Sequence, residues 1–452
     1  MIKKNDELIA DIIDNGFEGE GIAKIENFTV FVQGAIKGEK VKIHILKVNS
    51  SFAFAKIVQI IEKSDKRVNE DCDTYFKCGG CNLRHYKYVE TLELKKNIVQ
   101  NLVNKSLHDK IKVNNVIGME NPFFYRNKAQ YPCGLDKNGN RIIGVFANRS
   151  HNIIPFTECM IQDRKSQEIA RFINNFLNEK NISVYNEEDG TGLFRHIVIK
   201  VGKKSDEIMC IIVLNGDKFK DEEILVKELV KNYPNIKTIV KNINTKNTNV
   251  ILGDKNVVLY GSGYIEDKLG EYTFKISPMS FYQINPIQTE KLYNRAIQMA
   301  ELAGNETIFD LYCGIGTIGI FASKYVKKVY GIEIVPEAIE DAKENARING
   351  IQNIDFFAGD VEKLLPDLLE KQDVSCDIVF FDPPRKGLDV NTINNIINVK
   401  PKKIVYISCN PATLVRDLKV FEDTYNIEEI QPVDMFPFTS HTETIAVLNL
   451  KQ

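Results

Sequence analysis

From about residue 266 onward, the chain alternates short apolar runs with amphipathic stretches, and this alternation restricts the possible fold more than any other feature. Strand-like runs occupy residues 307–309, 328–332, 354–357, 377–381, 404–407 and 443–450. Helix-like stretches lie between several of them, at 318–324, 336–349 and 390–398. Strands and helices in alternation predict a doubly wound parallel sheet, which binds ligands beyond the carboxyl ends of its strands. The loops that follow the strands are therefore where functional groups are expected.

A glycine-rich loop follows the first of these strands, with the sequence Asp310-Leu311-Tyr312-Cys313-Gly314-Ile315-Gly316-Thr317-Ile318-Gly319. Its glycines let the backbone approach a ligand, and the next helix offers free N–H groups, a pattern that also fits dinucleotide binding. Glu333 ends the second strand, where a carboxylate can bind both ribose hydroxyls of NAD or S-adenosylmethionine. Asp310 and Asp360 add negative charge, which disfavours a pyrophosphate and suits the sulfonium and amine of S-adenosylmethionine.

The turn Asp382-Pro383-Pro384-Arg385 follows the fourth strand. Many methyltransferases place an acid-Pro-Pro turn here, beside the methyl group that is transferred. Enzymes that methylate exocyclic nitrogens usually have an aromatic residue after the two prolines, to stack on the base. Arg385 occupies that place, which disfavours nitrogen methylation.

Cys409 follows the fifth strand within Ser408-Cys409-Asn410-Pro411. A cysteine here can be a small core residue or a nucleophile, and its position alone leaves both possibilities open. Methylation of carbon 5 of uracil requires a thiolate that adds to carbon 6, and then a base that removes the proton from carbon 5. Glu443, at the start of the last strand, could supply the base. The sequence does not identify the group that favours the thiolate.

The N-terminal residues 1–62 contain short β-like runs separated by glycines, which predicts a small barrel. The region combines lysine and phenylalanine residues: Lys37, Lys40, Lys42, Lys47, Lys56, Phe28, Phe31, Phe52 and Phe54. Such a combination suits single-stranded nucleic acid, whose bases stack and whose phosphates pair with cations. An ordinary barrel with a phenylalanine core and a solvated lysine face fits equally well.

Residues 63–265 predict an α+β region, with an amphipathic helix at 89–107, helices at 164–178 and 221–231, and strands at 197–201 and 208–213. Two groups of basic and aromatic residues could face RNA or simply lie on the surface: Tyr125-Arg126-Asn127-Lys128 and Phe194-Arg195-His196.

The cysteines of this region suggest a metal site. The spacing suits a shared metal, for which zinc is the usual occupant, in Cys72, Cys78 and Cys81, with Cys159 further along. We assign no chemistry to Cys133, Cys210, Cys313 and Cys376.

Size and charge set broader limits. A chain of 452 residues predicts two to four domains. The net charge of −2 provides no global basic field, so any contact with nucleic acid must use local patches. We expect no membrane span, because no run of eighteen apolar residues occurs, and no signal peptide at the N-terminus. Nine scattered cysteines do not indicate a disulfide framework and favour a reducing, cytoplasmic location.

Five motifs occur together and in order: Phe281-Tyr282-Gln283-Ile284-Asn285, the glycine-rich loop, Asp-Pro-Pro-Arg, Ser-Cys-Asn-Pro and His441-Thr442-Glu443. Over essentially its whole length the chain resembles the bacterial RNA (uracil-5-)-methyltransferase family. The resemblance implies that Cys409 is the nucleophile and Glu443 the base. It implies that S-adenosylmethionine is contacted by Gln283, Tyr312, Glu333 and Asp382. Asp382 would also contact the uracil.

The same resemblance predicts three domains: a TRAM RNA-binding barrel at 1–62, an α+β domain at 63–265 and a Rossmann-like methyltransferase domain at 266–452. The cysteine spacing resembles the iron–sulfur branch of the family, which implies that a 4Fe-4S cluster, or zinc as the alternative, is held by Cys72, Cys78, Cys81 and Cys159. This branch implies that the partner is 23S ribosomal RNA rather than DNA or membrane, and that the protein is a monomer. The target uridine would have to be unstacked to reach the thiol.

Three other functions fit part of these sequence features. The tRNA branch of the family is similar in its catalytic half but generally lacks the barrel and these cysteines. An RNA-binding module that only senses S-adenosylmethionine would not need Cys409 and Glu443. An NAD-dependent oxidoreductase would rest on the glycine-rich loop alone and would leave Asp-Pro-Pro-Arg and Ser-Cys-Asn-Pro unexplained.

Overall fold

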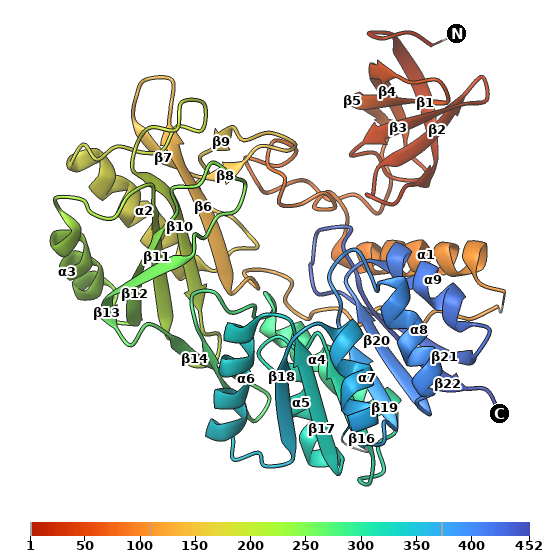
Figure 1. Ribbon diagram of the computed structural model, residues 1–452. Helices are drawn as coiled ribbons and strands as arrows, with labels where there is room; N and C mark the ends of the chain where they lie inside the picture. The colour runs from red at the N-terminus through yellow and green to blue at the C-terminus, as the bar shows by residue number, and fades with distance from the viewer. Residues whose placement is uncertain (1, 109, 372–373) are drawn as a thin grey trace.

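A computed structural model describes residues 2–108, 110–371 and 374–452, and shows a barrel, a middle sheet and a larger C-terminal sheet (Figure 1). The predicted N-terminal barrel is confirmed. It is closed in the order β1-β2-β3-β5-β4, with β1 (Glu7–Asn15), β2 (Gly21–Ile25), β3 (Phe28–Gln33), β4 (Lys40–Val48) and β5 (Phe52–Glu62).

The aromatic side chains of the barrel do not form its core. Small and β-branched residues fill the interior, among them Val30, Val32, Ala53 and Ala55. Phe31, Phe52 and Phe54 alternate with them and point outward, with ring centroids 5.3 to 5.9 Å apart. The alternative of a phenylalanine core is therefore wrong for these three residues, because strand alternation places them on the outer face.

The middle sheet has the order β13-β12-β11-β10-β6-β7. Its strands are β6 (Lys128–Leu135), β7 (Arg141–Ile143), β10 (Phe194–Val201), β11 (Ile208–Leu214), β12 (Ile236–Ile243) and β13 (Lys255–Gly261). One face packs on helices α2 (Arg164–Glu179) and α3 (Glu222–Asn232). The other face packs on the hairpin of β14 (Ile265–Leu269) and β15 (Tyr272–Ile276), which joins it to the C-terminal core. A two-stranded ladder of β8 (Val145–Phe146) and β9 (Ile153–Ile154) lies beside it.

The C-terminal sheet has the order β18-β17-β16-β19-β20-β22-β21. All the predicted strands are present, as β16 (Thr307–Leu311), β17 (Lys328–Glu333), β18 (Ile354–Ala358), β19 (Ile378–Phe381), β20 (Lys403–Ser408) and β22 (Glu443–Leu450). The prediction of a purely parallel sheet is wrong for β22, which runs antiparallel to both β20 and β21 (Tyr425–Val433). The connection from β21 to β22 covers only residues 434–442, too few for the crossover that a parallel strand requires.

Helices cover both faces of this sheet (Figure 1). One face carries α4 (Pro286–Ala300), α5 (Thr317–Ala322) and α6 (Pro336–Ile348). The other carries α7 (Val361–Lys371), α8 (Val390–Val399), α9 (Pro411–Phe421) and, from the N-terminal half of the chain, α1 (Tyr88–Ser106). The segment after α1 continues along the sheet edge, where Val113 pairs with Ile430 and Ile117 with Val433. Within the described ranges, no helix is both long and apolar enough to cross a membrane.

A buried ion pair fastens α1 to the loop between β21 and β22. Lys95 on α1 and Asp434 are both fully buried, and Lys95 Nζ contacts Asp434 Oδ1. Tyr88 donates to the other carboxylate oxygen at 2.7 Å, and Lys95 also donates to the carbonyl of Phe436 at 3.2 Å. A charge buried this deeply is stable only while its partner is present.

We expect Lys95→Met to lower the free energy of unfolding by about 3–5 kcal/mol, because Asp434 would keep a buried charge without a cation. Urea unfolding followed by circular dichroism measures this change. The matched control is Lys42→Met, which breaks an exposed pair with Glu7 and should cost less than about 1 kcal/mol. Equal losses in the two variants would contradict the prediction.

Candidate active site

The glycine-rich loop joins β16 to α5 and is held by two carboxylates. Glu333, at the end of β17, accepts hydrogen bonds from the N–H groups of Gly314 at 3.2 Å and Val335 at 3.0 Å. Asp310 is fully buried and accepts from the N–H of Gly319 at 2.7 Å, while its Oδ1 has no hydrogen-bond partner among the described residues. Burial raises the pKa of Asp310 to about 7. Asp310 therefore shapes the loop, and its second oxygen is left for a ligand or a proton.

Two positions in this loop have left-handed backbone conformations that most residues avoid. Gly316 has φ +81°, and a Cβ there would lie 2.6 Å from Cζ of Phe356, so both backbone and packing require glycine. Tyr312 has φ +62°, which is unusual for an aromatic residue, and its hydroxyl lies 3.4 Å from Oγ1 of Thr392 on α8. The tyrosine is thereby held at the rim of the loop beside α8.

The segment that carries Gln283 is placed by the middle sheet. Gln283 Nε2 donates to Asp382 Oδ2 at 3.2 Å, after β19. Asn127 donates through its side chain to the carbonyl of Gln283 at 3.0 Å and through its backbone to that of Ile284 at 2.9 Å. Burial raises the pKa of Asp382 to about 7, and the hydrogen bond from Gln283 acts against this shift.

Both groups of residues that the sequence offers as RNA-facing or surface positions are largely buried. Tyr125 and Asn127 have exposed fractions of 2% and 5%. Phe194, Arg195 and His196 are also buried, in a central strand of the middle sheet. Neither interpretation fits the buried residues, because β10 is buried along its whole length and Asn127 lies against the Gln283 segment, whereas Arg126 and Lys128 are only partly buried. Asn127 instead has a role that sequence patterns do not show, since it holds Gln283.

Cys409 and Glu443 come from neighbouring strands of the C-terminal sheet. Ser408, the last residue of β20, pairs with Thr444 near the start of β22. Cys409 follows Ser408 and Glu443 precedes Thr444, so both residues lie at the same sheet edge. This juxtaposition depends on the antiparallel direction of β22, because the start of a parallel strand would lie at the opposite edge.

The backbone around Cys409 is fixed by the start of α9. Asn410 caps the helix by accepting from the N–H of Ala412 at 3.1 Å, and Pro411 is the first helical residue. Ser408 Oγ contacts both the N–H and the carbonyl of Asn410 at 3.2 Å. Asn410 Nδ2 also donates to the carbonyl of Arg385 at 3.3 Å, so the turn after β19 is attached to the same helix start.

The site concentrates negative charge away from solvent. Burial, then the charge of Asp382, raises the pKa of Glu443 well above its ordinary value, and Glu443 Oε2 has no hydrogen-bond partner among the described residues. Burial, then Glu443 and Asp382, raises the pKa of Cys409 to about 12. Arg385 is the cation that opposes both shifts and so favours the thiolate. The sequence alone did not identify this group.

The four cysteines of the predicted cluster line one small cavity. Cys72, Cys78, Cys81 and Cys159 share it with apolar and aromatic side chains. The N–H of Gly80 donates to Cys78 Sγ at 3.2 Å, and Thr74 Oγ1 lies 3.4 Å from Cys72 Sγ. Across the described parts of the chain, no group of three or more His, Cys, Asp or Glu side chains is arranged to hold a metal ion. The four thiols line one cavity without being gathered closely enough to hold a metal as they stand, although sulfur is the ligand type that soft metals prefer.

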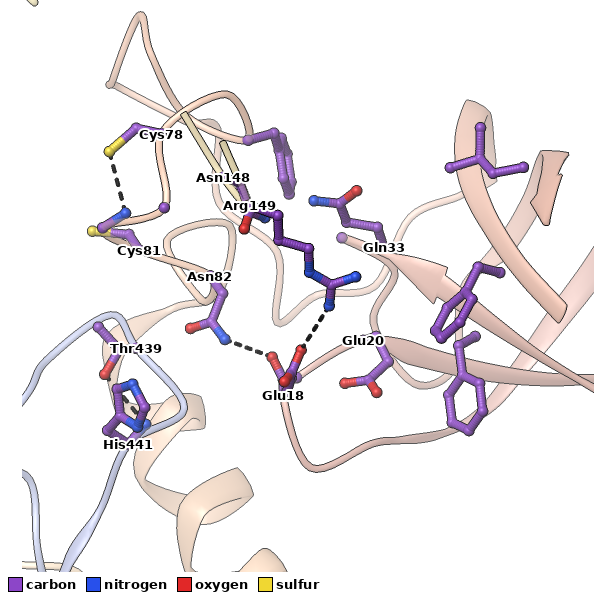
Figure 2. A pocket seen from close by; sticks show the side chains of 18 of the residues that line it. Glu18, Glu20, Gln33, Cys78, Cys81, Asn82, Asn148, Arg149, Thr439 and His441 are labelled. Atoms are coloured by element: carbon purple, nitrogen blue, oxygen red, sulfur yellow. Dashed lines mark hydrogen bonds and ion pairs between the residues drawn. The ribbon is translucent and has the colours of Figure 1, made fainter. Parts of the chain in front are cut away.

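A larger cleft lies between the barrel, the cysteine loop (residues 72–87) and the loop before β22 (Figure 2). The barrel contributes Phe31, Gln33 and Phe54. The opposite wall is polar and includes Asn82, Arg149 and His441. His441 is exposed to the cleft, and its pKa is lowered to about 4 by partial desolvation of its ring and by nearby cations, of which Arg385 is the strongest. The outward-facing aromatic residues of the barrel thus face a cleft that runs toward the segment leading into Glu443.

Comparisons with known proteins agree along the whole chain. The family model described as tRNA (Uracil-5-)-methyltransferase matches residues 217–451, and the TRAM domain model matches residues 4–58. An uncharacterized RNA methyltransferase of Clostridium acetobutylicum is 48% identical over 451 residues, which is 99% of this chain and 98% of that protein. One from Staphylococcus epidermidis is 44% identical over 452 residues, covering 100% of this chain and 99% of its own.

A solved structure is similar over nearly the full length. It is the tRNA (uracil-54, C5)-methyltransferase of Pyrococcus abyssi in complex with S-adenosyl-L-homocysteine. The TM-score is 0.78 at 27% sequence identity, and the alignment covers 98% of this chain and 100% of that one. The barrel, the middle sheet and the C-terminal sheet all fall within this alignment.

Proposed function

The chain belongs to the RNA (uracil-5-)-methyltransferase family and carries an N-terminal TRAM domain, and from this we propose that it methylates carbon 5 of a uridine in 23S ribosomal RNA through a covalent adduct on Cys409. The observation that carries the proposed mechanism is the position of Cys409 and Glu443 at one sheet edge, with Asp382 and Arg385 beside them. S-adenosylmethionine, when bound, supplies the methyl group.

The proposed reaction assigns one task to each side chain. The Cys409 thiolate, favoured by Arg385, adds to carbon 6 of uracil and makes carbon 5 nucleophilic. Carbon 5 then forms a bond to the methyl carbon while the bond from that carbon to the sulfonium sulfur breaks, so that S-adenosyl-L-homocysteine leaves. Glu443 then removes the proton that carbon 5 still carries. The electrons of that C–H bond re-form the double bond between carbons 5 and 6, and the bond from carbon 6 to sulfur breaks. Gln283 and Asp382 hold the ring and the methyl donor, and Tyr312 and Glu333 hold the rest of the donor.

The carboxylates of the site suit a cationic ligand. Asp310 Oδ1 is buried without a hydrogen-bond partner among the described residues, and the pKa of both Asp310 and Asp382 is raised to about 7. A positive sulfonium nearby favours the ionised form of both side chains. A neutral ligand of the same shape would leave each of them only about half ionised at pH 7.

We expect the affinity for S-adenosylmethionine to increase roughly tenfold between pH 6 and pH 8, because only about a tenth of a group with a pKa of 7 is ionised at pH 6. Isothermal titration calorimetry measures the change. S-adenosyl-L-homocysteine, whose sulfur is uncharged, is the control and should show little pH dependence. Asp382→Asn should weaken the dependence and leave the part that Asp310 contributes, whereas equal pH profiles for the two ligands would contradict the prediction.

A tRNA substrate is the second candidate, and a specific observation favours it. The solved structure that aligns with 98% of this chain is a tRNA methyltransferase, so the three-part architecture does not by itself favour ribosomal RNA. Mass spectrometry of rRNA and tRNA from cells that lack the protein decides between the two. Loss of one 5-methyluridine from 23S rRNA, restored by the wild-type gene but not by Cys409→Ala, supports the proposal. Loss from tRNA alone overturns the rRNA assignment.

We also propose that Cys72, Cys78, Cys81 and Cys159 hold a 4Fe-4S cluster. The supporting observation is that all four thiols line one cavity and that Cys78 Sγ accepts a backbone N–H, an interaction that tunes iron–sulfur centres. Anaerobically purified protein should contain iron and absorb broadly near ~400 nm, as thiolate-bound iron–sulfur centres do. Cys81→Ser should lose the iron, and Cys376→Ser, outside the cavity, should keep it. Zinc in a colourless protein would overturn the assignment.

A further inference from the structure

We infer that Asn82 is a positioning residue for Glu443, because it fastens the cysteine loop to the loop that leads into β22. The inference rests on the proposed role of Glu443 as the base that removes the proton from carbon 5. It adds a residue that lies outside the motifs of the C-terminal domain and next to the predicted metal ligand Cys81.

Asn82 joins three parts of the chain through its side chain. Its Oδ1 accepts from the N–H of Ser440 at 2.8 Å, and its Nδ2 donates to Ser440 Oγ at 3.0 Å and to the carbonyl of Glu18 in the barrel at 2.7 Å. The backbone strengthens the attachment, since the N–H groups of Asn82 and Leu83 donate to the carbonyl of Phe438 at 3.1 and 3.0 Å. Figure 2 shows Asn82 between Glu18 and the segment of Thr439 and His441.

The attached loop is held at both ends. The ion pair of Lys95 with Asp434 fixes its start, and Asn82 fixes its end at Ser440. Between these two points Phe438 has a left-handed φ of +64°, and Thr439 Oγ1 donates to the carbonyl of Phe436 at 2.8 Å. The loop therefore has a defined conformation that depends on contacts with α1 and with the cysteine loop.

The position of Glu443 depends on this loop. Only His441 and Thr442 separate Ser440 from Glu443, a span of at most about 10 Å in an extended chain. Glu443 Oε2 is buried without a hydrogen-bond partner in the described parts of the protein. Because that oxygen is not held by a side-chain contact, the backbone at the start of β22 sets where it lies. Glu443 pairs with Val433 of β21, and a shift of Ser440 would change how the chain enters this pair and so where the carboxylate points.

Cys409 does not depend on the same contacts. It follows β20, and Ser408 and Asn410 hold its backbone through the start of α9. Loss of the Asn82 side chain should therefore slow proton removal and leave addition of the thiolate nearly unchanged. A residue that only stabilised the fold would affect both steps alike.

The experiment separates these two steps with the full-length protein. RNA containing 5-fluorouracil is trapped once the thiolate has added and the methyl group has been transferred, because fluorine replaces the proton that the base would remove. With this RNA, Asn82→Ala should form the adduct within about twofold of the wild-type rate, whereas with natural RNA its methylated adduct should persist about tenfold longer, the scale expected for a displaced catalytic group. Gel electrophoresis under denaturing conditions measures both rates.

Two variants act as controls. Asn178→Ala removes a side chain with a matching set of bonds, two donated and one accepted, far from the site on α2. It should change neither rate. Asn82→Asp keeps the oxygen that accepts from the N–H of Ser440 and loses the donor to the carbonyl of Glu18. It should recover most of the release rate, because the hydrogen bond to Ser440 is the one that positions the loop before Glu443.

The outcomes separate this inference from the proposed function. If Glu443→Gln accumulates the methylated adduct and Asn82→Ala does not, the role of Asn82 is overturned and the base assignment stands. Equal slowing of trapping and release in Asn82→Ala also overturns it. If Glu443→Gln itself accumulates no adduct, the base assignment fails, and the inference fails with it.

Discussion

Replacement of Cys409 by alanine is expected to abolish both methyl transfer to RNA and covalent capture of RNA that contains 5-fluorouracil. The reason is chemical, because carbon 5 of uracil cannot attack the sulfonium methyl group until a nucleophile has added to carbon 6. We expect a loss of at least about 10³-fold in the rate of methyl transfer, as is typical when a covalent nucleophile is removed. Transfer of a radioactive methyl group to RNA under single-turnover conditions measures this rate.

Two further variants make the result specific. Cys409→Ser keeps a similar shape but has a hydroxyl that is far less ionised than a thiol, and it should be as inactive as the alanine variant. Cys376→Ala removes a half-buried thiol at the opposite end of β19 and should retain full activity. Binding of S-adenosyl-L-homocysteine should be unchanged in all three variants. A covalent adduct that still forms with Cys409→Ala would disprove the assignment.

The sequence predicted six of the seven strands of the C-terminal sheet, because each is a short apolar run with loop residues on both sides, and it missed β21, in which charged and polar residues interrupt the apolar ones. Periodicity could not give the direction of β22, which depends on the short connection from β21 and on pairing with β20. That direction nevertheless decides the site, since it brings Glu443 to the edge where Cys409 lies. The motifs identified Cys409 and Glu443, and the topology explains how both could reach the same uracil ring.

The groups that support the site were harder to predict, because they come from distant parts of the chain. Asn127 resembles a surface residue in its local sequence, yet it is buried and holds Gln283 through hydrogen bonds. Lys95 lies on an ordinary amphipathic helix, and its buried partner Asp434 is 339 residues away. In the sequence, Arg385 stands only where an aromatic residue would indicate nitrogen methylation, whereas in the structure it is the cation that favours the Cys409 thiolate. No local pattern encodes contacts of this kind.

Substrate choice is a different problem from chemistry. The proposed reaction needs only one unstacked uracil, so the choice among RNAs must come from surfaces that recognise the surrounding shape. The cleft of Figure 2 is a candidate for such a surface, since Phe31 and Phe54 offer stacking positions, while its polar side carries both charges, with Arg149 paired to Glu18 at 3.7 Å. The cleft lies between the barrel and the loop before Glu443, so an RNA segment bound there would lie next to the proposed catalytic base.

Replacement of Glu443 by glutamine should have the second large effect, on a different step. Glutamine cannot accept the proton from carbon 5, so the thiolate cannot leave, and the methylated RNA should remain attached to the protein. We expect release to slow by about 10²–10⁴-fold, the usual contribution of a general base. Rapid-quench experiments with natural RNA, analysed by denaturing electrophoresis, measure formation and decay of the adduct separately. Adduct formation should be nearly unchanged.

The pH dependence gives an independent check on the same residue. The pKa of Glu443 is raised well above its ordinary value by burial and by Asp382, and a general base acts only when it has lost its proton. The release rate of the wild-type protein should therefore fall as the pH is lowered, from a higher pH than an ordinary glutamate would require, and that of Glu443→Gln should stay slow at every pH. Glu422→Gln is the matched control. Like Glu443, Glu422 is buried, and one of its carboxylate oxygens has no hydrogen-bond partner among the described residues. It lies at the end of α9, away from the site. This variant should release methylated RNA at the wild-type rate, and rapid release by Glu443→Gln would show that another group removes the proton.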